Sequence, residues 1–367
     1  MSSQLFTPIT IGSMTLKNRI VVPPMCQYSA NNGLLSPWHT IHYGGFACSS
    51  AGMVIVEATG VLPEGRITPF CPGIWNDEQG QKHAEMLNAI RPYATMPIGI
   101  QLAHAGRKGS TRPMWIRGGM VPPEEGGWIP VAPSAIAFND GETLPAALSE
   151  ADIVKTVKAF GDAAKRAHEA GYDFLELHSA HGYLLHQFLS PVSNKREDSY
   201  GGSLENRMRF TLEAFKAIRA AFPTEKPVGV RISATDWIEG GWDVESSRVL
   251  LQELEKLGCA YAHISSGGLS PEQKIAPGPS YQVELAAELK KSLSIPTIAV
   301  GLITSPEQAE GIIVSEQADM VAIGRGMLFD PRWPWKAAMQ LGASVEAPPQ
   351  YWRGAPYLGK NLFIQPD

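Results

Sequence analysis

The chain is 367 residues long, and its 44% hydrophobic and 18% charged residues are typical of a globular protein with one large core and exclude extensive disorder. A formal net charge of −5 without a block of Lys or Arg argues against nucleic-acid binding, so we expect small-molecule ligands. No run of about 18 consecutive apolar residues occurs, and no basic segment followed by an apolar one opens the sequence, so we expect a cytoplasmic protein that binds no membrane.

Short apolar runs with β-forming residues recur along the chain and predict eight strands. Amphipathic stretches separate several of them and predict helices over Asp152–Ala170, Leu204–Phe222 and Ser246–Leu257. Gly171 follows the first of these helices at once, which is a typical helix stop. In chain order the predicted strands are Arg19–Val22, Met53–Val56, Ile98–Leu102, Phe174–Leu177, Val228–Ile232, Tyr261–Ile264, Thr297–Val300 and Met320–Ile323.

The alternation of strands and helices, without a break in composition, predicts parallel βαβ units. Eight such units close most naturally into a single α/β domain, a (β/α)₈ TIM barrel over residues 1–367. The alternative is a doubly wound sheet, but no Gly-x-Gly-x-x-Gly opens a helix after any predicted strand. The segment 105–148 is rich in Gly, Pro and Trp and too long for an ordinary loop, so we expect a lid or hairpin over the barrel mouth.

The most informative stretch is His178-Ser-Ala-His181-Gly-Tyr183, directly after the fourth predicted strand. Barrel enzymes carry their reactive groups at the carboxyl ends of strands, where two imidazoles and a phenol could hydrogen-bond one oxygen and supply a proton nearby. The cluster therefore predicts activation of a carbonyl. A structural His-x-x-His pair is one alternative, and a zinc site is another. No third ligand recurs at metal spacing near the other strand ends, so we expect no metal.

The seventh and eighth predicted strands end in Gly301 and in Gly324-Arg325. In barrels the loops after these two strands commonly bind phosphate through backbone N–H groups, which glycine lets approach closely. An arginine can bind phosphate oxygens in a bidentate manner. These residues predict a phosphate-bearing ligand, with glycines that merely turn the chain and a solvated Arg325 as the alternative.

Gln101 and Arg231 lie inside apolar strand runs, where an unpaired polar group would cost several kcal/mol. We therefore expect both to bind something polar, and a flat heteroaromatic ring with acceptor edges would satisfy them together. For Arg231 the alternative is a structural partner inside the barrel, either Glu57 or Glu176.

Many separated motifs in the same order make the chain resemble the old yellow enzyme family of FMN-dependent ene-reductases. The similarity is to its branch of thermophilic-like and xenobiotic-reductase members, and it covers nearly the whole chain. The motifs are Leu16–Ile20, Pro23–Tyr28, Val56–Thr59, Glu64–Ile67, Gln101–Lys108, Ala132–Ser134, His178–Tyr183, Ser193–Arg196, Tyr200–Ser203, Asn206-Arg207 and Gly324-Arg325.

The resemblance implies that FMN lies across the barrel mouth and that NADH or NADPH reduces it. The phosphate would lie near Gly301, Gly324 and Arg325, and the pyrimidine edge near Gln101 and Arg231. The implied cofactor-binding residues are Pro23, Pro24, Met25, Cys26, Ala58, Gln101, His178, Arg231, Gly301, Gly324 and Arg325.

The resemblance also implies a reaction, the reduction of the C=C bond of an α,β-unsaturated carbonyl or nitroalkene. His178 and His181 would hydrogen-bond the substrate oxygen, and Tyr183 would protonate the α-carbon. Cys26, Tyr28 and Lys108 would line the substrate pocket. The alternatives are a small buried hydrophobe for Cys26 and a solvated loop charge for Lys108.

The C-terminal segment, about 345–367, includes Gln350–Gly354, which resembles the part of this branch that reaches into a neighbouring protomer's site. Arg353 would enter that site, with Trp352 or Tyr351 as an aromatic wall, so we expect a homodimer or homotetramer. The chain continues past this motif through Ala355–Asp367, unlike the shorter members. The alternatives to an ene-reductase are a metal- or phosphate-dependent barrel lyase and a non-catalytic flavin-binding protein.

Overall fold

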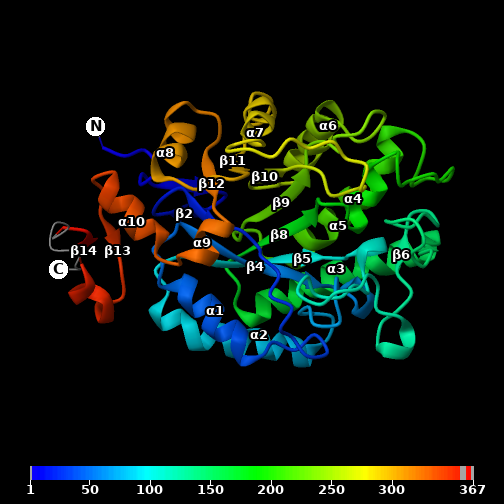
Figure 1. Ribbon diagram of the computed structural model, residues 1–367, viewed down its shortest axis with the longest axis horizontal. Helices are drawn as coiled ribbons and strands as arrows, with labels where there is room; N and C mark the ends of the chain where they lie inside the picture. Colours follow the sequence, from blue (N-terminus) through cyan, green and yellow to red (C-terminus); the bar gives the residue numbers. More distant parts are fainter. Residues whose placement is uncertain (1, 356–360, 365–367) are drawn as a thin grey trace.

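Eight parallel strands close into a barrel in the computed structural model, which describes residues 2–355 and 361–364 (Figure 1). The last strand pairs with the first, so the sheet has no free edge. The (β/α)₈ fold expected from the sequence is confirmed. The barrel strands are β3 (Ile20–Val22), β4 (Met53–Gly60), β5 (Ile98–Ala103), β8 (Phe174–Ser179), β9 (Val228–Ser233), β10 (Ala262–Ser265), β11 (Thr297–Val300) and β12 (Met320–Ala322).

Two strands, β4 and β8, end two or more residues later than the sequence indicated, and both differences concern the site. β4 runs to Gly60 rather than Val56, with a register shift against β5 between Val56 and Thr59. The predicted end was wrong because Glu57 interrupts the apolar run, although its side chain is buried inside the fold. β8 continues through His178, so this imidazole is carried by the strand itself rather than by the loop after it.

A ring of helices surrounds the barrel, and the three predicted helices are confirmed (Figure 1). α3 begins after the N-cap Ser149, whose side chain accepts a hydrogen bond from Asp152 N, and it ends at Gly171 in a left-handed conformation. The helices are α1 (Pro37–Ala47), α2 (Asp77–Ile90), α3 (Glu150–Ala170), α4 (Leu184–Leu189), α5 (Leu204–Ala221), α6 (Val244–Lys256), α7 (Val283–Lys290), α8 (Pro306–Val314), α9 (Arg325–Phe329) and α10 (Trp333–Gln340).

A small antiparallel hairpin of β1 (Ile9–Ile11) and β2 (Met14–Leu16) closes the amino end of the barrel, and the sequence did not indicate it. Ile11 and Leu16 are fully buried and cluster with Phe174, the first residue of β8, while Ile9 and Met14 are partly buried against the same cluster. The hairpin excludes water from that end, so the open end of the barrel is the carboxyl end.

The segment 105–148 leaves β5 and lies at the right edge of Figure 1, around β6. It contains two 3₁₀ turns, η3 (Gly106–Lys108) and η4 (Pro123–Glu125), and a short parallel pair, β6 (Val131–Ala132) and β7 (Ala146–Ala147). Trp115 is 63% exposed, yet its ring meets that of Tyr28 edge-on at 5.7 Å between centroids. This segment therefore touches the loop after β3.

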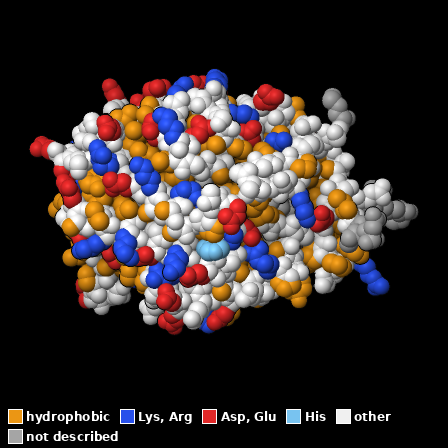
Figure 2. Space-filling view, turned by 180° about the vertical axis from the view of Figure 1, so that it is seen from behind, with side chains coloured by type: hydrophobic (Ala, Val, Ile, Leu, Met, Phe, Trp, Pro, Cys, Tyr) orange, Lys and Arg blue, Asp and Glu red, His pale blue; other side chains and the backbone are white. Residues whose placement is uncertain are grey.

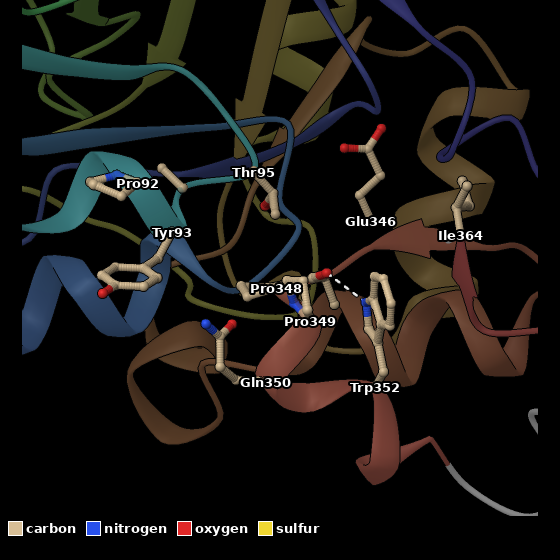
Figure 3. Close-up of a pocket in the computed structure, with 11 residues that line it drawn as sticks. Pro92, Tyr93, Thr95, Glu346, Pro348, Pro349, Gln350, Trp352 and Ile364 are labelled. Carbon is tan, nitrogen blue, oxygen red and sulfur yellow. Dashed lines mark hydrogen bonds between the residues drawn. The ribbon is translucent and has the colours of Figure 1, made fainter. Parts of the chain in front are cut away.

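The C-terminal segment packs at the opposite edge of Figure 1, as β13 (Val345–Glu346), η5 (Pro349–Gly354) and β14 (Phe363–Ile364). Beside it, a cavity of about 530 Å³ borders the loop 92–95, which precedes β5 at the amino end (Figure 3). Trp352 lines this cavity and donates from Nε1 to Ala347 O at 2.9 Å, whereas Arg353 is exposed. Residues 356–360 and 365–367 of the predicted C-terminal segment lie outside the described residues.

On the face shown in Figure 2, Lys and Arg side chains are interspersed with Asp and Glu, and apolar side chains lie between them. Within the described ranges, none of the helices has both the length and the apolar character needed to cross a membrane.

Candidate functional site

The structure brings His178, His181 and Tyr183 together at the carboxyl end of β8. The His178 ring lies 5.2 Å from that of His181 and 5.0 Å from that of Tyr183, both edge-on. The chain turns sharply between them, because His181 and Gly182 both have a positive φ, 58° and 72°. Left-handed backbone is costly for a residue with a Cβ, so the surrounding structure must hold His181 in place.

A buried pair under this turn supplies such support. Gly182 N donates to His186 Nδ1 at 2.9 Å, and His186 Nε2 lies 2.8 Å from Asp236 Oδ1, with both side chains fully buried. His181 N also donates to Ser233 Oγ at 2.9 Å. We conclude that the turn carrying the two imidazoles and the phenol is firmly fixed to β9 and α4.

Gly182 is the residue of this turn least able to accept a side chain. A Cβ there would lie 2.1 Å from Gly268 O, in addition to the strain of the positive φ. We expect Gly182→Ala to cost about 2–5 kcal/mol of the free energy of unfolding, measured by denaturant titration. Gly141→Ala is the matched control, since Gly141 has a φ of 80° and open space around it. Equal losses in both variants would contradict close packing at the turn.

Burial sets the protonation of the three groups. It lowers the pKa of His178 and His181 well below 6.5, helped by the charge of Arg231, and it raises the pKa of Tyr183 well above 10. The imidazoles are therefore neutral and the phenol keeps its proton. Ala180 N donates to His178 Nδ1 at 3.3 Å, which places the proton of that ring on Nε2. The cluster can thus donate hydrogen bonds to an oxygen and a proton to a nearby atom.

Lys108 is not a solvated loop charge. Its Nζ donates to His181 O at 2.9 Å and to Gly268 O at 2.8 Å, and it lies 5.2 Å from the centre of the Tyr183 ring. Burial lowers the pKa of this amine to about 8. Lys108 therefore ties the segment 105–148 to the histidine turn and places a cation beside the phenol.

The ends of β11 and β12 form a second part of the site. A cavity of about 190 Å³ opens there, and its walls include Gly301, Gly324, Arg325 and Arg231. Gly301 has a φ of 130°, and a Cβ on it would lie 3.0 Å from Gln282 Nε2. The predicted phosphate-site residues are thus brought together, with Arg325 exposed at the rim.

Arg231 is a buried residue in the wall of this cavity, and its Nε has no hydrogen-bond partner among the described residues. Neither carboxylate offered as its structural partner forms an ion pair with it. Glu57 accepts from Gln27 N instead, and Glu176 accepts from Gln101 Nε2 at 2.7 Å. Burial lowers the pKa of Arg231, and a buried guanidinium with a free N–H is a site for an acceptor from a ligand.

The residues after β3 form the wall between these two parts. Pro23 is buried, while Pro24, Met25, Cys26 and Tyr28 are half-buried. Met25 Sδ and Pro23 Cγ each lie 3.6 Å from the position that a Cβ on Gly324 would take, and Ala58 of β4 is also buried. Burial raises the pKa of the Cys26 thiol, so it is neutral and carries no thiolate. Small and apolar side chains therefore lie on this side of the carboxyl end of the barrel.

Glu57 supports that wall from behind. Its carboxyl accepts from Gln27 N at 2.7 Å and from Tyr43 Oη at 3.1 Å, and burial raises its pKa from 4.5 to about 8. The folded protein therefore holds a proton that the unfolded chain releases above about pH 4.5. The resulting stabilisation is complete below about pH 4.5 and is lost by about pH 8.

We expect Glu57→Gln to flatten the pH dependence of Tm across this window, because the amide does not titrate. In the wild type, the titration of Glu57 should lower the free energy of unfolding by at most about 1.4 kcal/mol for each unit that the pH rises between about 4.5 and about 8. Glu205→Gln, at a side chain that is 84% exposed, is the control and should run parallel to the wild type. A Glu57→Gln curve parallel to the wild type would show that the carboxyl has its ordinary pKa.

Sequence reasoning missed several residues of the site. Ser265, Tyr281 and Gln282 line the 190 Å³ cavity, and Ser265 Oγ lies 2.7 Å from His181 Nε2. The signal was present, since Ser265-Ser-Gly follows the sixth predicted strand and offers hydroxyl groups at that strand end. Within the described ranges no group of three or more His, Cys, Asp or Glu residues could hold a metal ion.

Comparison with known proteins extends these observations. The family model for the NADH:flavin oxidoreductase / NADH oxidase family matches residues 4–343. An NADPH dehydrogenase of Geobacillus thermodenitrificans is 44% identical over 356 residues, covering 96% of this chain and 99% of the relative. The NADPH dehydrogenase of Bacillus subtilis is 42% identical, covering 96% and 100%. Among solved structures, morphinone reductase aligns with a TM-score of 0.76 at 30% identity, covering 94% of this chain and 91% of that one.

Proposed function

Because the chain belongs to the NADH:flavin oxidoreductase / NADH oxidase family, we propose that it is an ene-reductase of the old yellow enzyme type. FMN is its cofactor, and a reduced nicotinamide nucleotide is its reductant. The family supports an oxidoreductase rather than a lyase or a flavin-storing protein. Its substrates in this proposal are α,β-unsaturated carbonyls and nitroalkenes.

The residues at the carboxyl end of the barrel fit FMN. The 190 Å³ cavity with Gly301, Gly324 and Arg325 suits a phosphate, and the free Nε–H of buried Arg231 suits an acceptor on a heteroaromatic edge. The remaining residues proposed to hold the group are Pro23, Pro24, Met25, Cys26, Ala58, Gln101 and His178. When bound, FMN passes hydride equivalents from the nicotinamide to the alkene.

His178 and His181 would donate hydrogen bonds to the carbonyl or nitro oxygen of the substrate. As the β-carbon gains hydride, negative charge develops on that oxygen, so donors that are fixed in advance stabilise the transition state more than the ground state. Their neutrality matters, because a buried imidazole with its proton fixed on one nitrogen keeps its orientation throughout the reaction.

Tyr183 would then deliver its proton to the α-carbon. Burial keeps the phenol protonated, and its ring lies beside that of His178 on the same face of the turn. Lys108, with Nζ over the Tyr183 ring, would favour the phenolate that forms after the transfer.

The single observation that carries this proposal is the neutral His178–His181–Tyr183 cluster, fixed next to a cavity with a free buried guanidinium. Cys26 and Tyr28 would complete the substrate pocket. From the neighbouring protomer of a homodimer or homotetramer, Arg353 and Trp352 would approach the same site. We also propose a cytoplasmic location, where reduced nicotinamide is supplied.

The test is to purify the protein, identify the released chromophore by mass spectrometry and follow NADPH and NADH oxidation without oxygen, with and without 2-cyclohexenone. The proposal requires bound FMN and alkene-dependent oxidation that yields cyclohexanone. A protein that does not retain added FMN would exclude it. A yellow protein without alkene turnover would be a flavin carrier or an oxidoreductase of another substrate class.

A further inference from the structure

A chain of buried polar groups crosses the inside of the barrel below the site. Gln101 of β5 donates from Nε2 to Glu176 Oε1 at 2.7 Å, and His263 of β10 lies with Nδ1 2.9 Å from Glu176 Oε2. The side chains of Glu176 and His263 are both fully buried. Gln101 is directly opposite Glu176 in the β5–β8 ladder, so the sheet itself fixes this contact.

Each oxygen of Glu176 has one nitrogen partner, an arrangement that suits a carboxylate with two N–H donors. The donors are an amide N–H of Gln101 and a ring N–H of His263. Burial lowers the pKa of His263, so this imidazole is neutral and its single proton lies on Nδ1. Its Nε2 is buried without a hydrogen-bond partner in the described part of the chain. Glu176 and His263 together therefore carry one negative charge rather than none.

Arg231 is the cation that faces this carboxylate. Arg231 is on β9, which lies between β8 and β10. It is directly opposite His178 of β8 on one side and His263 of β10 on the other. Among the surrounding charges, that of Glu176 acts most strongly on Arg231 and opposes the effect of burial. The other titratable groups around the pair include His178 on β8 and Tyr261 directly before β10, with Cys26, Tyr183 and Tyr281 near Arg231. All of them are neutral because burial disfavours their charged forms.

We infer that Glu176, held by Gln101 and His263, is a positioning residue that offsets the charge of Arg231 and so sets the reduction equilibrium of the bound flavin. Arg231 alone would stabilise the added electrons strongly, since reduction places negative charge beside it. The Glu176 carboxylate opposes that effect from the other side and keeps the flavin a better hydride donor. This inference rests on the FMN of the proposed function, and it assigns a role to Glu176 and His263, neither of which is proposed to touch the cofactor.

The test compares four FMN-loaded proteins in anaerobic titrations against a reference dye. Glu176→Gln keeps the shape and removes the charge. Its oxygen can accept from Gln101, and its amide N–H can donate to His263 Nδ1 once the proton of that ring lies on Nε2. We expect the flavin equilibrium of this variant to shift toward the reduced form by at least ten-fold, or about 30 mV for a two-electron couple. Glu176→Asp and His263→Asn keep the carboxylate and are expected to stay within three-fold of the wild type.

Two results would overturn the inference. One is a Glu176→Gln protein that binds FMN with an equilibrium within three-fold of the wild type. The other is a ten-fold shift of the flavin equilibrium in His263→Asn, which would show that packing rather than charge sets this equilibrium. That second result overturns the inference even if Glu176→Gln does not fold. Either result leaves the proposed function standing as long as the wild type binds FMN and reduces 2-cyclohexenone, so the two failures are distinguishable.

Discussion

Replacing His178 and His181 together by alanine should lower kcat/KM for the reduction of 2-cyclohexenone by about 10³–10⁴-fold. Each lost donor to a developing oxyanion typically costs about 10²–10³-fold, and two donors to one oxygen are not fully additive. Flavin should stay bound, because Arg231 and the cavity with Gly301 and Gly324 are untouched. The measurement is stopped-flow kinetics of the two half-reactions, with flavin content determined separately.

His168→Ala is the matched control for the double variant, since His168 is an exposed histidine in the last turn of α3, which leads into the amino end of β8. Its alkene reduction should equal that of the wild type. If the double variant reduced the alkene at the wild-type rate, the two imidazoles would not polarise the substrate. If the double variant lost its flavin and with it both half-reactions, the main role of the two imidazoles would be to bind the cofactor.

Tyr183→Phe should slow the oxidation of the reduced protein by alkene about 10²–10⁴-fold, the usual contribution of a positioned proton donor. Flavin reduction by NADPH needs no proton from this phenol and should change by less than about three-fold. The substitution removes one oxygen and leaves the ring beside His178 in place, so the turn should keep its geometry. Both rates come from rapid mixing experiments under anaerobic conditions.

Tyr93→Phe, at a tyrosine that is 52% exposed, controls for the general effect of removing a phenol oxygen. Equal slowing of both half-reactions in Tyr183→Phe would argue for a role in ligand binding. Unchanged alkene reduction would show that the proton comes from another donor, such as solvent.

The barrel could be predicted from the sequence because parallel strands are buried on both faces. Each one is a short, nearly continuous apolar run, and such runs are visible without any tertiary information. The hairpin β1–β2 escaped the same reasoning, since its strands have three residues each and are stabilised by apolar contacts with the barrel interior. The predicted end of β4 was wrong because Glu57 is a charged residue type, which indicates a strand end when its buried hydrogen-bond partners are unknown.

The histidine turn could be predicted because its three functional side chains lie within six consecutive residues. The grouping of Gly301, Gly324, Arg325 and Arg231 needed one further step, the closure of the barrel, which brings the strand ends into one ring. Whether these residues act as proposed is for the variants to show.

What the sequence could not supply is the choice of partner among buried polar groups. Arg231 had two candidate carboxylates, and the structure pairs both of them elsewhere. The position of Lys108 likewise depends on how the segment 105–148 folds back onto the histidine turn. Pairings of this kind are set by strand register and by the direction of each side chain, and neither follows from local pattern.

The central claim is that two neutral imidazoles face a flavin across the carboxyl end of the barrel and hold the oxygen of the substrate. A crystal structure of the FMN-loaded protein with a bound phenol tests it most directly, because a phenolate oxygen resembles the charged oxygen of the reacting alkene. The account predicts that oxygen within about 2.6–3.2 Å of one nitrogen of His178 and one of His181, with the phenol ring stacked on the flavin. A phenol bound elsewhere, or imidazoles turned away from the flavin, would contradict it.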